Sequence, residues 1–187
     1  MSAPIAGIVF DLDGTLIDSR GDIAAAALHA LVENGFPTLP VPTLLTYVGD
    51  GARPLLARSA GIPADDARLD AMYASFIDYY TRHPLVHTEF CAGAEAALKS
   101  LERFPLAICT NKPRVTTELV LAGLGIASAF RVVVAGNDLP RTKPDPLPDP
   151  SHCRGARGGA ERARDGGRWR ARRALGAQRG RAQRRRA

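Results

Sequence analysis

The segment Ile5–Leu16 constrains this 187-residue chain more than any other, because its short apolar run ends abruptly at two carboxylates. The run contains Ile, Val and Phe, which favour strands, and it is too short for a convincing helix. Side chains two residues apart on an extended segment point to the same side, so Asp11 and Asp13 project together beyond the strand end. Gly14 then permits a sharp turn. Open α/β sheets bind ligands at this end, so the segment predicts a strand that delivers acids to a ligand-binding crevice.

Two close carboxylates suit a metal site, a shared proton, or an acid and nucleophile pair, and the flanking residues favour a nucleophile with a metal. An aspartate can attack phosphorus and form an aspartyl-phosphate. A carboxylate that approaches a phosphate dianion at about 4 Å meets a repulsion of several kcal/mol at an effective dielectric constant of ~20. A cation must therefore lie between them, and Mg²⁺ is expected because it prefers oxygen ligands. The alternative is a strand end whose Asp caps the next helix.

The sequence Asp11–Leu16, DLDGTL, resembles the first motif of the haloacid-dehalogenase-like phosphatases. The resemblance implies that Asp11 is the nucleophile and a Mg²⁺ ligand. It implies that Asp13 is the general acid/base, with its backbone carbonyl also on the metal. Dehalogenases of the same superfamily lack the second Asp, so Asp13 indicates phosphoryl chemistry.

The rest of the first 148 residues predicts an α/β protein with a helical insertion. Apolar residues recur at helical spacing through residues 19–83, whereas Pro105–Thr110 and Arg131–Ala135 have the composition of strands separated by a helix. Strands that alternate with helices imply a parallel sheet. We expect a Rossmann-like core from residues 1–18 and 84–148, incomplete at its end, and a small helical cap from residues 19–83.

Polar side chains follow the second and third predicted strands. Thr110 and Asn111 can donate hydrogen bonds to phosphate oxygens, although Thr110 is equally suited to cap the helix that begins near Pro113. The resemblance implies that Thr110 binds the phosphoryl group and that Lys143 is the catalytic lysine that neutralises the nucleophile and the phosphate. Taken alone, Lys143 would be interpreted as a solvated surface residue.

Three further segments resemble the phosphoglycolate phosphatase family: Val48–Ala52, Leu106–Pro113 and Asp138–Pro146. The resemblance covers about residues 4–148 and implies Mg²⁺-dependent hydrolysis of 2-phosphoglycolate to glycolate and phosphate. It also implies that Gly49–Arg53 is a cap loop folded over the site, with Arg53 paired to the substrate carboxylate. The alternative for this loop is a glycine-permitted turn in which Asp50 caps the next helix.

The residues after 150 differ in composition from the rest of the chain. Residues 151–187 contain 13 of the 25 basic residues and two acids, Glu161 and Asp165, so they carry +11 while the first 150 residues carry −5. The high pI therefore belongs to this segment and says nothing about partners of the rest. Arg, Ala and Gly fill 28 of its 37 positions, a composition that cannot form a packed core. We expect the tail, residues 149–187, to be disordered.

The family's fourth motif, an apolar strand ending in Gly-Asp with a second acid four residues later, is missing after Pro150. Glu161 and Asp165 have the spacing but no preceding apolar strand. Because Arg, Ala, Gly and Pro have GC-rich codons, we hypothesise a shifted reading frame near residues 148–150. We then expect the first strand to lie at a sheet edge, poor solubility and little phosphatase activity. The alternatives are an inactive remnant and an arginine-rich arm that binds nucleic acid.

Cysteine use and hydropathy bound the remaining possibilities. Cys91, Cys109 and Cys153 form no C-x-x-C pair, which indicates neither a disulfide framework nor a zinc site. The start of the chain has no basic region followed by a long apolar stretch, and no segment has about 18 consecutive apolar residues. We expect a soluble, cytoplasmic protein that acts on a small phosphorylated metabolite. We expect no membrane partner, and only non-specific nucleic-acid binding through residues 151–187.

Overall fold

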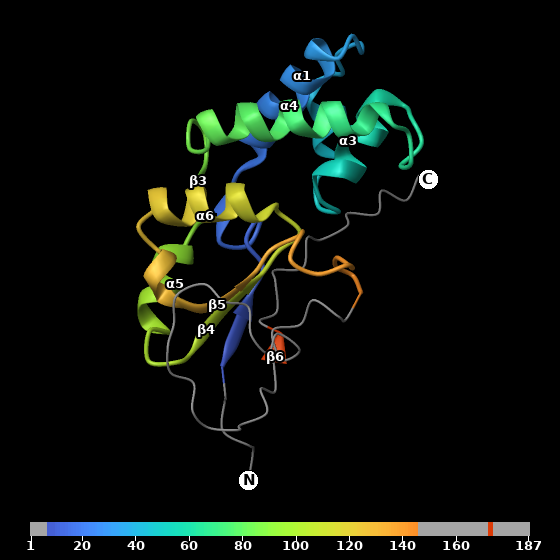
Figure 1. Cartoon of the computed structure of the whole chain (residues 1–187). Helices are drawn as coiled ribbons and strands as arrows, with labels where there is room; N and C mark the ends of the chain where they lie inside the picture. The colour runs from blue at the N-terminus through green and yellow to red at the C-terminus, as the bar shows by residue number, and fades with distance from the viewer. Residues whose placement is uncertain (1–6, 146–171, 174–187) are drawn as a thin grey trace, which may run out of the picture.

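The protein has a helical layer above an α/β layer (Figure 1). The structure, a computed structural model, describes residues 7–145 and 172–173. The helices are α1 (Arg20–Glu33), α2 (Val41–Leu45), α3 (Ala52–Ala60), α4 (Arg68–Arg82), α5 (Ala94–Ser100), α6 (Arg114–Gly123) and the 3-10 helix η1 (Ala127–Ala129). The strands are β1 (Ile8–Phe10), β2 (Ile17–Asp18), β3 (Glu89–Phe90), β4 (Leu106–Cys109), β5 (Phe130–Val134) and β6 (Arg172–Arg173).

The main sheet has the strand order β5-β4-β1-β6, and every described pair is parallel. Strand β4 is buried at all four residues, as expected for a parallel strand covered on both faces. The predicted strands at Pro105–Thr110 and Arg131–Ala135 are observed as β4 and β5. The predicted fold class, a parallel sheet with helices, is confirmed.

Strand β6 corrects one expectation from the sequence. We expected β1 to lie at the sheet edge, but Ile8 and Val9 are in parallel register with Arg172 and Arg173. Backbone N–H and C=O groups form such a ladder whatever side chains they carry, and composition therefore could not exclude it. The other residues beyond 145 lie outside the described residues. The predictions that the tail is disordered and that it is a nucleic-acid-binding arm concern those residues.

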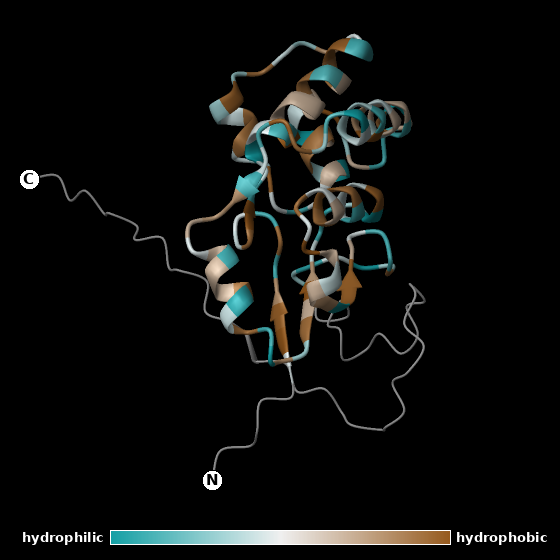
Figure 2. Cartoon of the chain, turned by 90° about the vertical axis from the view of Figure 1, so that its left-hand side faces the viewer, coloured by the Kyte–Doolittle hydropathy of each residue, from teal (hydrophilic) through white to brown (hydrophobic). Residues whose placement is uncertain are grey.

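Each layer has its own hydrophobic cluster. The buried residues of the first lie between Ile23 and Tyr80 on α1 to α4, and the second joins β1 and β4 to residues of α5 and α6. Strands β1 and β4 are apolar throughout, and β5 is apolar except at Arg131 (Figure 2). Helices α1 to α4 therefore pack against one another as a unit, above the carboxyl ends of the main-sheet strands.

The chain passes between the layers twice, and the two passages are tied together. Strands β2 and β3 pair antiparallel there, with Ile17 opposite Phe90. The buried Asp22 carboxylate in the first turn of α1 accepts hydrogen bonds from the backbone N–H groups of His87 and Thr88, both at 2.9 Å, and from the Thr88 hydroxyl at 2.6 Å. These bonds fix where the helical layer begins. In the described part of the chain, no helix is both long and apolar enough to cross a membrane.

An ion pair joins the start of α6 to the loop after β5. Arg114 Nε donates to Asp138 Oδ1 at 2.6 Å, and Arg114 Nη2 donates to the Val133 carbonyl at 2.8 Å. The backbone N–H of Ala135 donates to Asp138 Oδ2 at 2.7 Å. Burial disfavours the charged carboxylate, but the bonds from Arg114 and Ala135 outweigh burial and lower the pKa of Asp138.

We predict that Asp138→Asn changes the pH dependence of stability. A carboxyl whose folded-state pKa is depressed stabilises the protein above its unfolded pKa, about 3.9, and loses this effect as pH falls through the folded pKa. Asp138→Asn should therefore lower the free energy of unfolding by about 1 kcal/mol near pH 6. Urea unfolding between pH 2 and 7 measures the difference from wild type, which should shrink toward pH 2. A constant difference would contradict the assignment.

Candidate active site

The end of β1 presents both acids on one side of the chain. The side chain of Leu12 is fully buried, so the alternation of the extended chain turns Asp11 and Asp13 away from the core. Gly14, at φ +77°, closes the following turn, and its N–H donates to the Ile17 carbonyl at 2.7 Å. Asp11 Oδ1 accepts a bond from the Leu12 N–H at 2.8 Å. Neither acid caps α1, so the capping alternative is wrong.

Lys143, from the loop after β5, reaches the first acid. Its Nζ lies 2.7 Å from Asp11 Oδ1, with side-chain exposures of 31% and 45% respectively. Because β1 and β5 are parallel members of one sheet, their carboxyl ends lie at the same edge. The structure thus brings together Asp11 and Lys143, which are 132 positions apart in the sequence.

Thr110 follows β4 at the same edge and is 4% exposed. Its Oγ1 accepts a hydrogen bond from the Lys112 N–H at 3.1 Å. A hydroxyl that accepts one bond still has its proton to donate, as a phosphate contact requires. The residue at the N-cap of α6 is Pro113, so Thr110 does not cap that helix.

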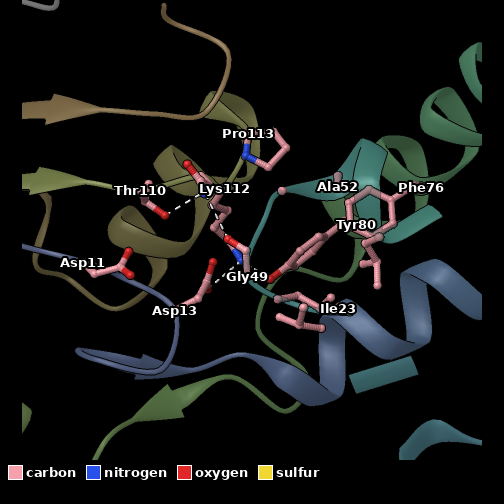
Figure 3. Close-up of a pocket in the computed structure, with 14 residues that line it drawn as sticks. Asp11, Asp13, Ile23, Gly49, Ala52, Phe76, Tyr80, Thr110, Lys112 and Pro113 are labelled. Carbon is pink, nitrogen blue, oxygen red and sulfur yellow. Dashed lines mark hydrogen bonds and ion pairs between the residues drawn. The ribbon is translucent and has the colours of Figure 1, made fainter. Parts of the chain in front are cut away.

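Lys112 is a functional candidate that the sequence reasoning missed. Its side chain is 2% exposed, and its Nζ lies 3.0 Å from Asp13 Oδ1 and 2.5 Å from the hydroxyl of Tyr80 on α4 (Figure 3). Burial disfavours its charge, but Asp13 and Tyr80 outweigh burial and raise the pKa of Lys112 above its ordinary value. Burial also raises the pKa of Tyr80. The only available signal was a lysine two residues after Thr110.

Ser19 is the second contact to Asp13 that the sequence did not reveal. Ser19 occupies the N-cap of α1, but its side chain makes no capping bond. Its hydroxyl instead donates to Asp13 Oδ1 at 2.5 Å, and the residue is 1% exposed. Asp13 is therefore held from two sides, by Ser19 and by Lys112.

Asn111 lines the site but its amide is engaged elsewhere. Its Nδ2 donates to the carbonyls of Gly49, at 3.0 Å, and Lys143, at 3.1 Å, while its Oδ1 accepts from the Lys143 N–H at 2.9 Å. An amide has two N–H donors, and both have acceptors here. The predicted phosphate contact by the Asn111 side chain is therefore not available in this arrangement.

The predicted cap loop lies at the site, but Arg53 does not. Gly49 and Gly51 line the pocket. Arg53 pairs with Asp70 of α4 at 2.6 Å, because that carboxylate lies within reach on the neighbouring helix. Asp50 pairs with Arg58 at 2.7 Å and does not cap α3. The expectation that Arg53 faces the substrate is not met.

The pocket has a polar floor and an apolar wall (Figure 3). The floor is formed by Asp11, Asp13, Thr110, Asn111 and Lys112, and the wall by residues of the helical layer: Ile23, Val48, Ala52, Leu55, Phe76 and Tyr80. Its volume is about 60 Å³, enough for several water molecules or one small anion. The site is suited to a compact substrate with a strongly polar end.

The donor atoms present are compatible with Mg²⁺. This ion commonly binds through one or two carboxylates and completes its shell with water and substrate oxygens. Asp11 is 45% exposed, and the lysine bonds described above involve only one oxygen of each acid. Among residues 7–145 and 172–173, no group of three or more His, Cys, Asp or Glu side chains is placed to hold a metal. Within the described residues, Asp11 and Asp13 are the two acids at this edge that would supply ligands to Mg²⁺.

Comparison with known proteins is consistent with this geometry. The family model of haloacid dehalogenase-like hydrolases matches residues 8–150. The chain belongs to the haloacid dehalogenase-like hydrolases. It is 39% identical over 147 residues to the phosphoglycolate phosphatase of Cereibacter sphaeroides, covering 76% of this chain and 67% of that protein. It is 37% identical over 150 residues to that of Neisseria meningitidis, covering 77% of this chain and 64% of that protein. Both relatives are phosphatases.

Solved haloacid dehalogenase-like structures share the fold. A predicted phosphoglycolate phosphatase from Haemophilus somnus has a TM-score of 0.68 and 27% identity, covering 77% of this chain and 68% of that one. The chain spans about two thirds of the length of the curated relatives it matches. The resemblance to haloacid dehalogenase-like hydrolases and to phosphoglycolate phosphatases, inferred from the sequence motifs, is therefore confirmed.

We predict that Lys112→Met destabilises the protein. The change leaves the Asp13 carboxylate, whose side chain is 21% exposed, without its cation. Breaking a buried pair from one side costs about 3–5 kcal/mol, and the partial exposure of Asp13 reduces this to about 2–3 kcal/mol. Chemical unfolding measures the loss, and adding Asp13→Asn should recover part of it. Equal stability of Lys112→Met and wild type would contradict a structural ion pair.

Proposed function

We propose that this haloacid dehalogenase-like hydrolase is a phosphomonoesterase that acts on a small substrate, with 2-phosphoglycolate as the first candidate. The observation that carries the proposal is the meeting of Asp11, Asp13, Lys143 and Thr110 at one edge of the sheet, beside a small pocket that Asp11, Asp13 and Thr110 line. The names of the relatives from Cereibacter sphaeroides and Neisseria meningitidis support the choice of substrate.

In the first half-reaction, an Asp11 carboxylate oxygen attacks phosphorus and the bond to the ester oxygen breaks. Asp13 gives a proton to the leaving alkoxide, which departs as an alcohol such as glycolate. Lys143 and Thr110 hold the phosphoryl oxygens, the lysine by charge and the threonine through its hydroxyl proton. In the second half-reaction, Asp13 takes a proton from water, which attacks the aspartyl-phosphate and releases phosphate.

A bound Mg²⁺ would supply positive charge between the nucleophile and the phosphate. Asp11 and Asp13 would hold it, the latter in part through its backbone carbonyl. The missing fourth motif would deprive that ion of a further acid, so we propose that turnover by the chain as written is low. We propose a reducing cytoplasm as the location, because the three cysteines form no C-x-x-C pair in the sequence.

The nucleophile assignment predicts that Asp11→Asn abolishes phosphorylation of the protein. The amide is a far weaker nucleophile, so single-turnover incubation with 2-phosphoglycolate should leave no acyl-phosphate on the peptide containing residue 11. Mass spectrometry after borohydride reduction detects the modified wild-type residue. Label on any other side chain, or phosphate release that survives Asp11→Asn, would end the proposal.

The missing motif predicts rescue by a chimera. Joining residues 1–148 to the remaining C-terminal part of the Cereibacter sphaeroides relative should raise phosphate release from 2-phosphoglycolate at least about 100-fold, equivalent to about 2.7 kcal/mol of barrier. Colorimetric phosphate detection with and without EDTA gives the rates. A chimera that carries Asp11→Asn is the matched control. A folded chimera no faster than the original chain would show that residues 1–148 lack the proposed site.

A further inference from the structure

Two adjacent residues, Asn111 and Lys112, connect the helical layer to the two acids. They occupy the loop between β4 and α6. Each makes one contact with the helical layer. Asn111 also holds the backbone of Lys143, which lies beside Asp11, and Lys112 itself lies beside Asp13. This arrangement goes beyond the proposed phosphatase activity, because neither residue need touch the phosphate to perform it.

The amide of Asn111 links the cap loop to Lys143. Its Nδ2 donates to the Gly49 carbonyl on one side. On the other side it makes two bonds with the Lys143 backbone, because Nδ2 donates to the Lys143 carbonyl and Oδ1 accepts from the Lys143 N–H. The loop approaches Asn111 so closely that a Cβ on Gly51 would lie 3.3 Å from the Asn111 carbonyl oxygen. A shift of the cap loop would therefore move Asn111 and, through it, the backbone of Lys143.

The ammonium of Lys112 links α4 to Asp13. Its Nζ lies 2.5 Å from the Tyr80 hydroxyl and 3.0 Å from Asp13 Oδ1, and 4.5 Å from the centre of the Tyr80 ring. A lysine side chain loses much of its rotational freedom when it is fixed, which costs free energy. The contacts from Tyr80 offset that cost, and they exist only while α4 lies over the sheet.

We propose that Asn111 and Lys112 form a latch, the 111–112 latch. When the helical layer contacts this latch, Lys143 is held beside Asp11 and Lys112 is held beside Asp13. Both are positioning residues. Closure of the helical layer over a substrate thereby prepares the nucleophile and the acid/base together. The catalytic meaning rests on the proposed function, but the geometry can be tested without turnover.

The rate at which each lysine side chain is acylated measures how well the latch holds and shields it. The chain has three lysines, and the exposed Lys99 is an internal reference for Lys112 and Lys143. The full-length protein is treated briefly with acetic anhydride, and the modified fraction at each lysine is measured by mass spectrometry. In wild type, acylation of Lys112 and Lys143 should be slower than that of Lys99, because both are paired and shielded.

Gly51→Ala tests transmission from the cap loop to Lys143. It changes no lysine and no acid, but its Cβ would press on Asn111 at a backbone φ of +101°. Gly61→Ala is the matched control, since Gly61 flanks the same helix α3 at φ +65° with nothing within 4 Å. We expect Gly51→Ala to raise acylation of Lys143 relative to Lys99 at least threefold, and Gly61→Ala to leave it unchanged.

Tyr80→Phe tests the contact between α4 and Lys112 with a smaller change. The latch therefore stays testable if Gly51→Ala does not fold. It removes one hydroxyl, and we expect at least a threefold rise in relative acylation of Lys112. Tyr79→Phe, one residue away on α4, should have no effect.

An unchanged Lys143 in folded Gly51→Ala, or an unchanged Lys112 in Tyr80→Phe, would overturn the latch. Equal rises in the control variants would also overturn it, because they would indicate general loosening. Failure of the Asp11 trapping experiment would instead overturn the phosphatase and leave these labelling results intact.

Discussion

Charge neutralisation at the end of β1 is the constraint on which the site depends. Two carboxylates two residues apart repel each other and any phosphate that approaches, by about 4 kcal/mol for unit charges 4 Å apart at an effective dielectric constant of 20. Each acid receives a lysine from a different loop, Asp11 from the loop after β5 and Asp13 from the loop after β4. Only a sheet whose strands all point the same way brings those loops to one edge. The parallel fold is therefore a requirement of the electrostatics.

The two pairs differ in burial, and the difference suits different roles. The Lys143–Asp11 pair has exposed side chains, and such a pair contributes little to stability and can exchange partners readily. An arriving phosphate can thus take over Lys143 without a large cost. The Lys112–Asp13 pair is enclosed by Tyr80 and Ser19, where losing a partner is expensive. We infer that Lys112 supports Asp13 while α4 lies over the sheet, rather than binding the substrate.

The residues whose placement follows from the sequence are those that local pattern determines. The alternation around Leu12 fixes the direction of Asp11 and Asp13, and apolar strands locate Thr110. The placements that the sequence did not reveal depend on distant contacts. Lys112 gains its importance from Tyr80, 32 positions away, and from Asp13, 99 positions away. Arg53 turns to Asp70 because of how α3 packs on α4. No periodicity in one sequence encodes such pairings, so they become visible only in three dimensions.

The residues of the candidate site all lie before the tail. Strands β1, β4 and β5 and their loops place both acids, both lysines and Thr110, all within residues 8–143. What the fourth motif would add is a further negative charge for a cation, and the latch contacts exist without it. A defect caused by its absence is therefore electrostatic rather than geometric. Under the proposed function, such a defect would slow the chemical step while Asp11 stays in position, and phosphate recognition would then outlast the loss of rate.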